Sequence, residues 1–303
     1  MLKVLDLFSG IGGFSRGLGL TGGFETVAFC EIEKFPQKVL TKHWPNVPIY
    51  EDVRNVTAEQ LRSDGIFPNV ITGGFPCQDI SIAGKGAGIN GSSSGLWFEY
   101  QRIIADIRPK YAIVENVSAL LGRGLSVVLG GLAEIGYDAA WTVYDSQHFG
   151  VPQRRRRVYI LAVRDGIATD ADIFQYSRRS DDECRKEVED NAKLRERDSK
   201  ERAGERHPFA FFTRQRSDEF ALRGLSSTLA KRDYKSYTDI VFEDDYLRRV
   251  TPQERMLLQG FPADWMDGLE GKDKELFRCN GMTTNVTQHI GERIISHENT
   301  QEV

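Results

Sequence analysis

The stretch "DLFSGIGGFSRGL", residues 6–18, decides the fold class of this chain. It joins a short apolar run to a glycine-rich turn and then to residues with helical spacing. A strand, a turn and a helix in this order let the backbone approach a ligand closely and point amide groups toward it. The stretch alone is a weak signal, because it contains neither Gly-x-Gly-x-x-Gly nor the Gly-Lys-Ser/Thr of a phosphate-binding loop.

Strand-like and helix-like patterns alternate from residue 3 to about 163. The strand candidates are "KVLDLF", "ETVAFCEI", "NVITGG", "YAIVENV", "AAWTVYDS" and "RVYILAV". Apolar residues recur at helical spacing in 33–44, 96–107 and 125–136. The alternation predicts an α/β fold with a mostly parallel sheet and helices on both faces. Ligands of such sheets bind beyond the carboxyl ends of the strands, so functional residues are expected there.

The composition is that of an ordinary globular protein. The 303 residues suffice for one large or two ordinary domains, and a net charge of −4 gives no overall attraction to nucleic acid, so any polyanion site must be local. The first residues lack a signal-peptide pattern, and no run approaches the roughly 20 apolar residues of a membrane span. We therefore expect a cytoplasmic protein without a membrane partner.

The cysteines are widely separated, without Cys-x-x-Cys or a histidine at ligand spacing: Cys30, Cys77, Cys184 and Cys279. This pattern argues against a disulfide framework and against a zinc site, and no metal is expected. Cys77 ends the stretch "NVITGGFPC", where a core filler, a redox partner, a metal ligand and a nucleophile are the alternatives. The residues at the neighbouring strand ends distinguish between these alternatives.

Two strand ends carry acids suited to a nucleoside. Glu31 follows the second strand about 25 residues after the first motif begins, where a carboxylate can hold both ribose hydroxyls; a surface glutamate is about as good an explanation. Asp52, in "EDVRNV", can accept a hydrogen bond from an adenine amino group. A nucleoside site without a phosphate loop favours S-adenosylmethionine over a dinucleotide.

A thiol and a carboxyl group follow at the next two strand ends, Cys77 in "FPCQ" and Glu115 in "ENV". Carbon 5 of a pyrimidine is too weak a nucleophile to take a methyl group directly. Attack of a thiolate at carbon 6, with protonation of N3, makes carbon 5 enamine-like. Cys77 and Glu115 are the residue types that this reaction needs.

With these motifs in place, the chain resembles the bacterial and phage DNA cytosine-5 methyltransferases from residue 4 to about 295. The matching segments, in family order, are "DLFSGIGGF", Glu31, Asp52, "GGFPCQDIS", "ENV", "QRRRRVYI" and "RRVTPQERMLLQGFP". Their joint match is far more specific than any single motif. It implies a Rossmann-like, S-adenosylmethionine-dependent methyltransferase fold with a smaller target-recognition domain.

For catalysis, the resemblance implies that Cys77 attacks carbon 6 of a cytosine flipped out of double-stranded DNA. Glu115 would act on N3, Gln153 and Arg155 belong to the family's Gln-x-Arg-x-Arg motif, and its last member Arg157 would hold the cytosine O2. The residues themselves leave open that "QRRRR" is a cluster that grips phosphate. Strand alternation predicts Gln153, Arg155 and Arg157 on one side and the arginines between them on the other.

For the cofactor, the resemblance implies a site made by the first motifs and the tenth: Phe8, Gly10, Gly12, Glu31, Asp52, Val53, Pro76 and Asn280. Glu31 would hold the ribose, and Asp52 with Val53 the adenine. The tenth motif departs from the family, because Cys279 stands where a glycine is usual. We expect this change to weaken cofactor binding at most.

The resemblance also divides the chain into a cofactor-binding and catalytic domain at 1–164, a target-recognition domain at 165–247, and a hinge with a C-terminal helix at 248–303. The charged run 178–206 is typical of a solvated helix or a mobile insertion. DNA contacts are expected from the loop after Cys77 and from the recognition domain, at Gln78, Lys85, Arg214, Arg216, Thr228, Lys231 and Arg232.

Three alternatives compete with a DNA methyltransferase. The branch of the family that methylates tRNA is disfavoured by "PCQ", an idle DNA-binding relative by the intact catalytic residues, and a hydride-transferring Rossmann enzyme by the missing glycine fingerprint. The expected partner is double-stranded DNA. We expect a monomer, with a companion restriction endonuclease that forms no stable complex with it.

Overall fold

The structure, a computed structural model, describes residues 1–76, 95–165, 210–213, 221–223, 225–229, 239–243, 246–269 and 281–301. The chain forms two compact units. Unit 1 comprises Met1–Tyr144, Arg156–Gln175 and Thr287–Val303, and unit 2 comprises Asp145–Arg155 and Tyr176–Val286. The domain boundaries drawn from the sequence stay predictions.

Unit 1 is built on a seven-stranded sheet with the order β3-β2-β1-β4-β5-β7-β6. Its strands are β1 (Leu2–Leu7), β2 (Phe24–Cys30), β3 (Ile49–Tyr50), β4 (Val70–Gly74), β5 (Tyr111–Val117), β6 (Tyr137–Asp145) and β7 (Arg156–Arg164). The β1 strand lies parallel between β2 and β4, and β4 pairs in parallel with β5. β7 runs antiparallel to β5. The predicted mostly parallel α/β sheet is confirmed.

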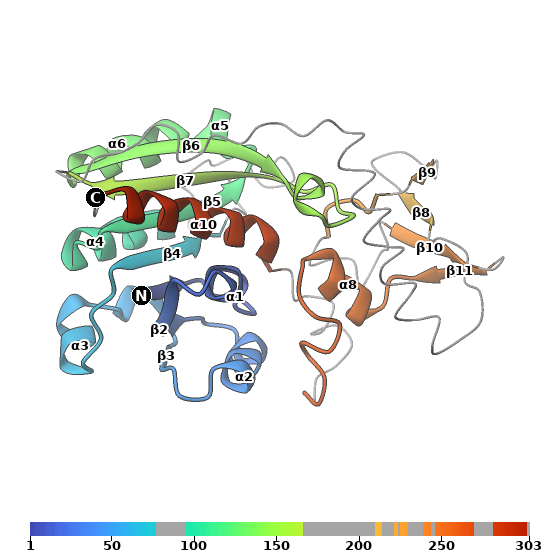
Figure 1. The fold of residues 1–303 in the computed structure, drawn as a ribbon, viewed down its shortest axis with the longest axis horizontal. Helices are drawn as coiled ribbons and strands as arrows, with labels where there is room; N and C mark the ends of the chain where they lie inside the picture. Colours follow the sequence, from blue (N-terminus) through green and yellow to red (C-terminus); the bar gives the residue numbers. More distant parts are fainter. Residues whose placement is uncertain are drawn as a thin grey trace. The chain divides into compact units, whose positions relative to one another are not determined.

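Helices cover both faces of this sheet (Figure 1). They are α1 (Gly13–Leu20), α2 (Lys34–His43), α3 (Ala58–Ser63), α4 (Leu96–Ile107), α5 (Leu120–Arg123), α6 (Leu125–Glu134) and α10 (Thr284–Gln301), with the short 3-10 turn η1 (Val53–Asn55) after β3. On one face, Leu5 and Val114 of the sheet form a core with Trp97 and Tyr100 of α4. Each such large apolar side chain contributes roughly 1.5–3 kcal/mol when fully buried.

On the other face, α10 returns to the sheet and packs against α1. A Cβ atom on Gly291 would lie 2.9 Å from the Leu18 side chain, so the two helices approach closely. Thr287 Oγ1 donates a hydrogen bond to the carbonyl oxygen of Gly13 at 3.1 Å. These contacts fix the helix that directly follows the glycine turn.

Unit 2 contains a four-stranded antiparallel sheet with the order β11-β10-β8-β9. Its elements are β8 (Ala210–Thr213), β9 (Ala221–Arg223), β10 (Asp239–Glu243), β11 (Tyr246–Arg249), the 3-10 turn η3 (Ser146–Phe149) and α8 (Pro252–Leu258). The segment "TPQERMLL" starts a helix for a local reason, because Thr251 caps α8 in a reciprocal capping box with Glu254 and Pro252 is its first residue.

The carboxyl ends of β1 to β5 meet at one edge of the unit 1 sheet, because these five strands are parallel. The strand order reverses between β1 and β4, which is where α/β sheets bind ligands. At this point a Cβ atom on Gly73 would lie 2.9 Å from the carbonyl oxygen of Leu7. Gly73, one of the two glycines before Cys77, therefore allows β1 and β4 to approach closely.

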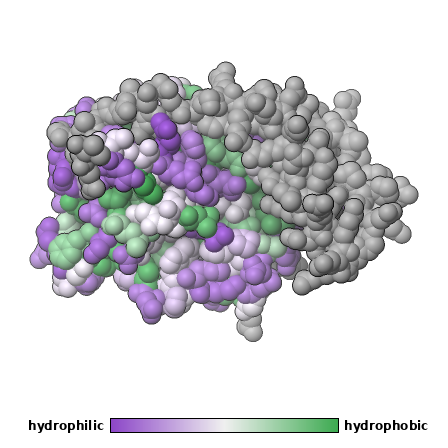
Figure 2. Space-filling view, in the orientation of Figure 1, coloured by the Kyte–Doolittle hydropathy of each residue, from purple (hydrophilic) through white to green (hydrophobic). Residues whose placement is uncertain are grey.

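In the described ranges, no helix is both long and apolar enough to cross a membrane. The described part of the face drawn in Figure 2 is a mosaic of hydrophilic and hydrophobic residues. Such mixing is usual for protein surfaces in contact with water.

Candidate active site

The turn after β1 has a backbone conformation that few residues tolerate. Phe8, Gly10 and Gly12 have positive φ angles of 52°, 54° and 86°. A Cβ atom on Gly12 would lie 2.6 Å from the Trp44 ring, whereas one on Gly10 would meet nothing within 4 Å. The left-handed conformation of Phe8 costs on the order of 1–3 kcal/mol. The open space beside Gly10 leaves room for a ligand against the backbone.

Glu31 ties this turn to the end of β2. Its Oε2 accepts a hydrogen bond from the Gly10 backbone nitrogen at 2.7 Å, and its Oε1 accepts one from the Glu33 nitrogen at 2.7 Å. Glu31 is only 8% exposed, so its carboxylate has a fixed orientation. A carboxylate oxygen can accept more than one hydrogen bond, so these contacts are compatible with the predicted role of Glu31 at a ribose.

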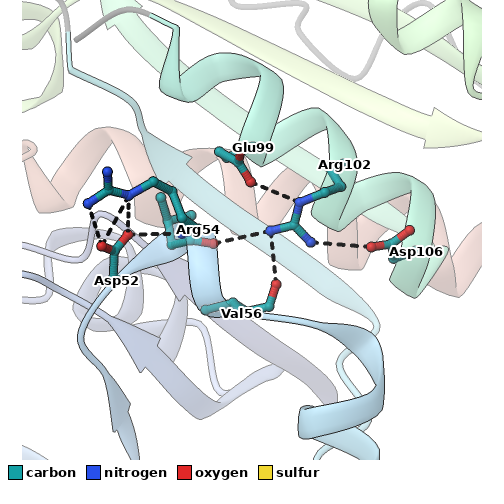
Figure 3. Close-up of polar contacts among 7 residues, drawn as sticks. Asp52, Arg54, Val56, Glu99, Arg102 and Asp106 are labelled. Atoms are coloured by element: carbon teal, nitrogen blue, oxygen red, sulfur yellow. Dashed lines mark hydrogen bonds and ion pairs between the residues drawn. The ribbon is translucent and has the colours of Figure 1, made fainter. Parts of the chain in front are cut away.

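Asp52 begins the η1 turn after β3. Its carboxylate accepts hydrogen bonds from the backbone nitrogen of Arg54 at 3.0 Å and from its guanidinium Nη2 at 2.6 Å (Figure 3). These hydrogen bonds from Arg54 hold the pKa of Asp52 below its usual range. The carboxylate predicted to bind adenine is therefore ionised at neutral pH and can only accept hydrogen bonds.

A buried carboxyl group that the sequence analysis missed lies beneath the glycine turn. Asp6 is 1% exposed, and it accepts hydrogen bonds from Ser15 Oγ at 2.8 Å and Thr72 Oγ1 at 3.0 Å. Burial raises the pKa of Asp6 to about 7. The signal that could have found it is an acid inside the otherwise apolar strand run "KVLDLF".

Ser9 links the glycine turn to the last residue of β2. Its backbone nitrogen donates to the Cys30 carbonyl oxygen at 3.1 Å, and its Oγ accepts from the Cys30 nitrogen at 3.2 Å. Burial raises the pKa of the Cys30 thiol to about 12, so this thiol stays protonated at neutral pH. Cys30 is therefore a structural cysteine.

Glu115 on β5 and Arg157 on β7 form an ion pair. In the antiparallel register, Glu115 lies opposite Tyr159 and Val117 lies opposite Arg157, which makes Glu115 and Arg157 diagonal neighbours on one face. Arg157 Nε lies 3.1 Å from Glu115 Oε1, and the two side chains are 13% and 12% exposed. The structure thus brings together two residues that were predicted to contact the same base.

Asn116 connects β5 to the segment that leads to Cys77. Its Nδ2 donates to the Phe75 carbonyl oxygen at 3.1 Å, and its Oδ1 accepts from the Val117 nitrogen at 2.8 Å. Phe75 is buried, with its ring centroid 5.6 Å from that of Trp97. The backbone two residues before Cys77 is therefore fixed beside the strand that carries Glu115. The sequence analysis missed this role of Asn116, for which the only signal is an amide inside a buried strand.

In unit 2, Gln153 and Arg155 are buried, at 0% and 6% exposure. The arginines at 154 and 156 are exposed, so burial follows the predicted alternation. Gln153 forms a parallel bridge with Ser226, and Thr228 Oγ1 donates to the Arg154 carbonyl oxygen at 2.8 Å. Within the described part of the chain, neither Nε2 nor Oε1 of Gln153 has a hydrogen-bond partner. A buried amide in this state is unusual, and a ligand is one explanation.

Several predicted site residues lie outside the described residues: Cys77, Gln78, Lys85, Arg214, Arg216, Lys231, Arg232 and Asn280. Cys279 and the charged run 178–206 also lie outside them. Among the residues that are described, no three or more metal-binding side chains gather in one place.

The mostly parallel sheet, with its glycine turn after β1, agrees with the predicted fold of an S-adenosylmethionine-dependent methyltransferase. The family model for C-5 cytosine-specific DNA methylase matches residues 2–296. The chain belongs to this family, and it is a DNA (cytosine-5-)-methyltransferase.

Two relatives agree with this assignment, and a solved structure shares the fold. The chain is 27% identical over 317 residues to the Type II methyltransferase M.SsoII of Shigella sonnei, which covers 97% of this chain and 80% of that protein. It is 30% identical over 318 residues to the Type II methyltransferase M2.BsuMI of Bacillus subtilis (strain 168), a match that covers 97% of this chain and 75% of that protein. The crystal structure of the S. pombe Dnmt2 methyltransferase has the same fold, with a TM-score of 0.72 and 20% sequence identity. The match covers 98% of this chain and 99% of the Dnmt2 chain.

Proposed function

We propose that this enzyme methylates a cytosine within one short sequence of double-stranded DNA, after the base has been flipped out of the helix. The observation that carries the proposal is the convergence of parts at one sheet edge of unit 1. The glycine turn with Glu31, the segment that leads to Cys77, and the Glu115 and Arg157 pair all reach this edge.

In this proposal, the Cys77 thiolate forms a bond to carbon 6 of the cytosine. Electron density moves toward N3, where Glu115 donates a proton or a hydrogen bond, while the neighbouring Arg157 holds O2. Carbon 5 then becomes nucleophilic enough to accept the methyl group, which S-adenosylmethionine carries on a positively charged sulfur. After the transfer, which leaves S-adenosylhomocysteine, water accepts the carbon 5 proton, the bond from carbon 6 to sulfur breaks, and N3 returns any proton that it took from Glu115. These changes restore the aromatic base and the free thiolate.

The residues of the first unit fit S-adenosylmethionine. The open space beside Gly10 accommodates a ligand, Glu31 can accept hydrogen bonds from ribose hydroxyls, and Asp52 can accept one from the adenine amino group. We assign Phe8, Gly12, Val53 and Pro76 to the same site on the family resemblance. Asp52 is an acceptor here, which suits an amino group and not a carbonyl.

Target recognition is assigned to unit 2. The side-chain amide of Gln153 is buried and has no hydrogen-bond partner among the described residues, which supports a role for this segment at the substrate. Arg155 and Thr228, with the basic residues predicted from the sequence, are assigned to DNA. The name Type II methyltransferase of two relatives supports a role in restriction–modification with a companion endonuclease. A monomeric, cytoplasmic enzyme stays a prediction.

The test uses purified protein, S-adenosylmethionine with a labelled methyl group, and separate double-stranded DNA and tRNA substrates. We expect label in the DNA, and bisulfite sequencing of that DNA should reveal protected cytosines within one short sequence. Label in tRNA alone would replace this proposal with the RNA alternative. No transfer to either substrate would support the idle DNA-binding alternative.

A further inference from the structure

The η1 turn, which Asp52 caps at its N-terminus, is held by an arginine from a distant element. Arg102 lies on α4, and its Nη2 donates hydrogen bonds to the carbonyl oxygens of Val53 at 3.3 Å and Val56 at 3.0 Å (Figure 3). Both valines are buried in the core that α4 shares with the sheet. A single guanidinium nitrogen therefore bridges the carbonyl groups of Val53 in η1 and of Val56 directly after it, which lie 49 and 46 residues earlier in the chain.

The pose of Arg102 is set by its own helix. Its Nε donates to Glu99 Oε2 at 2.8 Å, and its Nη1 lies 3.3 Å from Asp106 Oδ2. These partners lie three residues before and four residues after Arg102 on one face of α4, so they hold the guanidinium from both sides. The planar fork of an arginine can satisfy two carboxylates and two carbonyls at once, which a lysine cannot do.

The Asp52 carboxylate depends on the same turn. Asp52 caps η1 by accepting a hydrogen bond from the backbone nitrogen of Arg54. The Arg54 side chain also donates hydrogen bonds to both oxygens of the Asp52 carboxylate. The Asp52 carbonyl oxygen also accepts a hydrogen bond from the Asn55 nitrogen at 2.9 Å, which closes the turn. A shift of η1 would therefore move both the Asp52 carboxylate and the Val53 amide.

We propose that Arg102 is a positioning residue for cofactor recognition, because it braces the turn that presents Asp52 and Val53 to the adenine. This inference rests on the proposed function, which assigns the adenine to these two residues. Arg102 acts through η1 and is not a catalytic residue. Its loss should weaken cofactor binding without slowing methyl transfer once the cofactor site is saturated.

The test compares Arg102→Met, Arg102→Lys and the control Arg62→Met, which changes an exposed arginine on the nearby α3 helix. Calorimetry measures the Kd of S-adenosylhomocysteine and of S-inosylhomocysteine, in which a carbonyl replaces the adenine amino group. We expect Arg102→Met to raise the Kd of S-adenosylhomocysteine at least tenfold and the Kd of the inosine compound clearly less. Arg102→Lys should fall between Arg102→Met and wild type, and Arg62→Met should match wild type.

The preference for the amino group separates bracing from a general loss of fold, since a merely structural role would weaken both ligands equally. An unchanged ratio of the two Kd values in Arg102→Met would overturn the inference, as would a Kd for S-adenosylhomocysteine within twofold of wild type. In both cases DNA methylation by the wild-type enzyme would still stand. A wild-type enzyme that binds no S-adenosylhomocysteine would instead remove the proposed function.

Discussion

Glu115 on β5 and Arg157 on β7 pair across two antiparallel strands, with 3.1 Å between Oε1 and Nε. In the proposed mechanism, these residues hold N3 and O2 of one cytosine ring. The ion pair therefore fixes the spacing of two groups that must act on one planar base. It also keeps the acid beside a cation before the base enters.

Glu115→Gln should keep this geometry while removing the acid. We expect kcat to fall by a factor of about 10² to 10⁴, because general acid catalysis typically contributes that much. The Kd of S-adenosylmethionine should change less than twofold. Single-turnover methylation and calorimetry measure the two effects, and turnover within a factor of three of wild type would remove Glu115 as the acid.

Glu31→Ala should mainly weaken cofactor binding. The carboxylate accepts hydrogen bonds from the Gly10 and Glu33 amides, and hydrogen bonds to charged groups are each worth about 1.5–3 kcal/mol. We expect the Kd of S-adenosylmethionine to rise on the order of 10-fold or more, and Glu31→Gln to be milder. An unchanged Kd in Glu31→Ala would remove Glu31 from the cofactor site.

Asn116→Asp should slow methyl transfer without weakening cofactor binding. The substitution keeps an acceptor for the Val117 amide but replaces the donor to the Phe75 carbonyl oxygen with a carboxylate. Repulsion should displace the backbone before Cys77, and we expect kcat to fall about tenfold or more, because misplaced reacting groups are costly. Asn116→Asp with wild-type kcat and unchanged stability would show that this link has no role in catalysis.

Asp6 should make stability depend on pH. Its pKa rises from 3.8 to about 7 on folding, so the folded chain binds more protons than the unfolded chain between these values. The stabilisation from this group is complete below pH 3.8 and is lost as the pH rises through about 7. At about 1.4 kcal/mol per pKa unit, the loss is on the order of 4 kcal/mol.

Asp6→Asn removes this titration, because an amide stays neutral. Denaturant unfolding between pH 4.5 and 7.5 should show the wild type losing stability relative to Asp6→Asn as the pH rises. Asp138→Asn, which changes an exposed acid on β6, is the matched control and should run parallel to the wild type. Parallel profiles for Asp6→Asn and wild type would contradict the buried-acid account.

Most helices and strands of the first unit could be predicted from the sequence, because hydrophobic periodicity is visible within a single segment. The helix expected at 96–107 is α4, and six of the seven strands of the first sheet were foreseen. The two-residue β3 was not, because so short a strand carries no period. The antiparallel pairing of β7 was not foreseen either, because strand direction depends on the path of the chain between elements.

The site residues also fall into two groups, those that sequence motifs identify and those whose roles depend on distant partners. Glu31, Asp52, Glu115 and Arg157 stand in motifs, so sequence reasoning could name them. The roles of Asp6, Asn116 and Arg102 depend on partners that lie 41 to 66 residues away in the chain, as in the bonds to Thr72, Phe75 and the η1 carbonyls. Only a folded structure brings such partners together.

In the proposed mechanism, methylation occurs at carbon 5 and needs the thiol of Cys77. The most direct measurement is nucleoside mass spectrometry of plasmid DNA from a methylation-free host that expresses either the wild type or Cys77→Ser. We expect 5-methylcytosine with the wild type and none with Cys77→Ser, although the variant should still bind DNA, because a hydroxyl is a far weaker nucleophile at neutral pH. Methylation at N4 of cytosine, or 5-methylcytosine at wild-type levels with Cys77→Ser, would show that Cys77 is not the nucleophile of a carbon 5 methyltransferase.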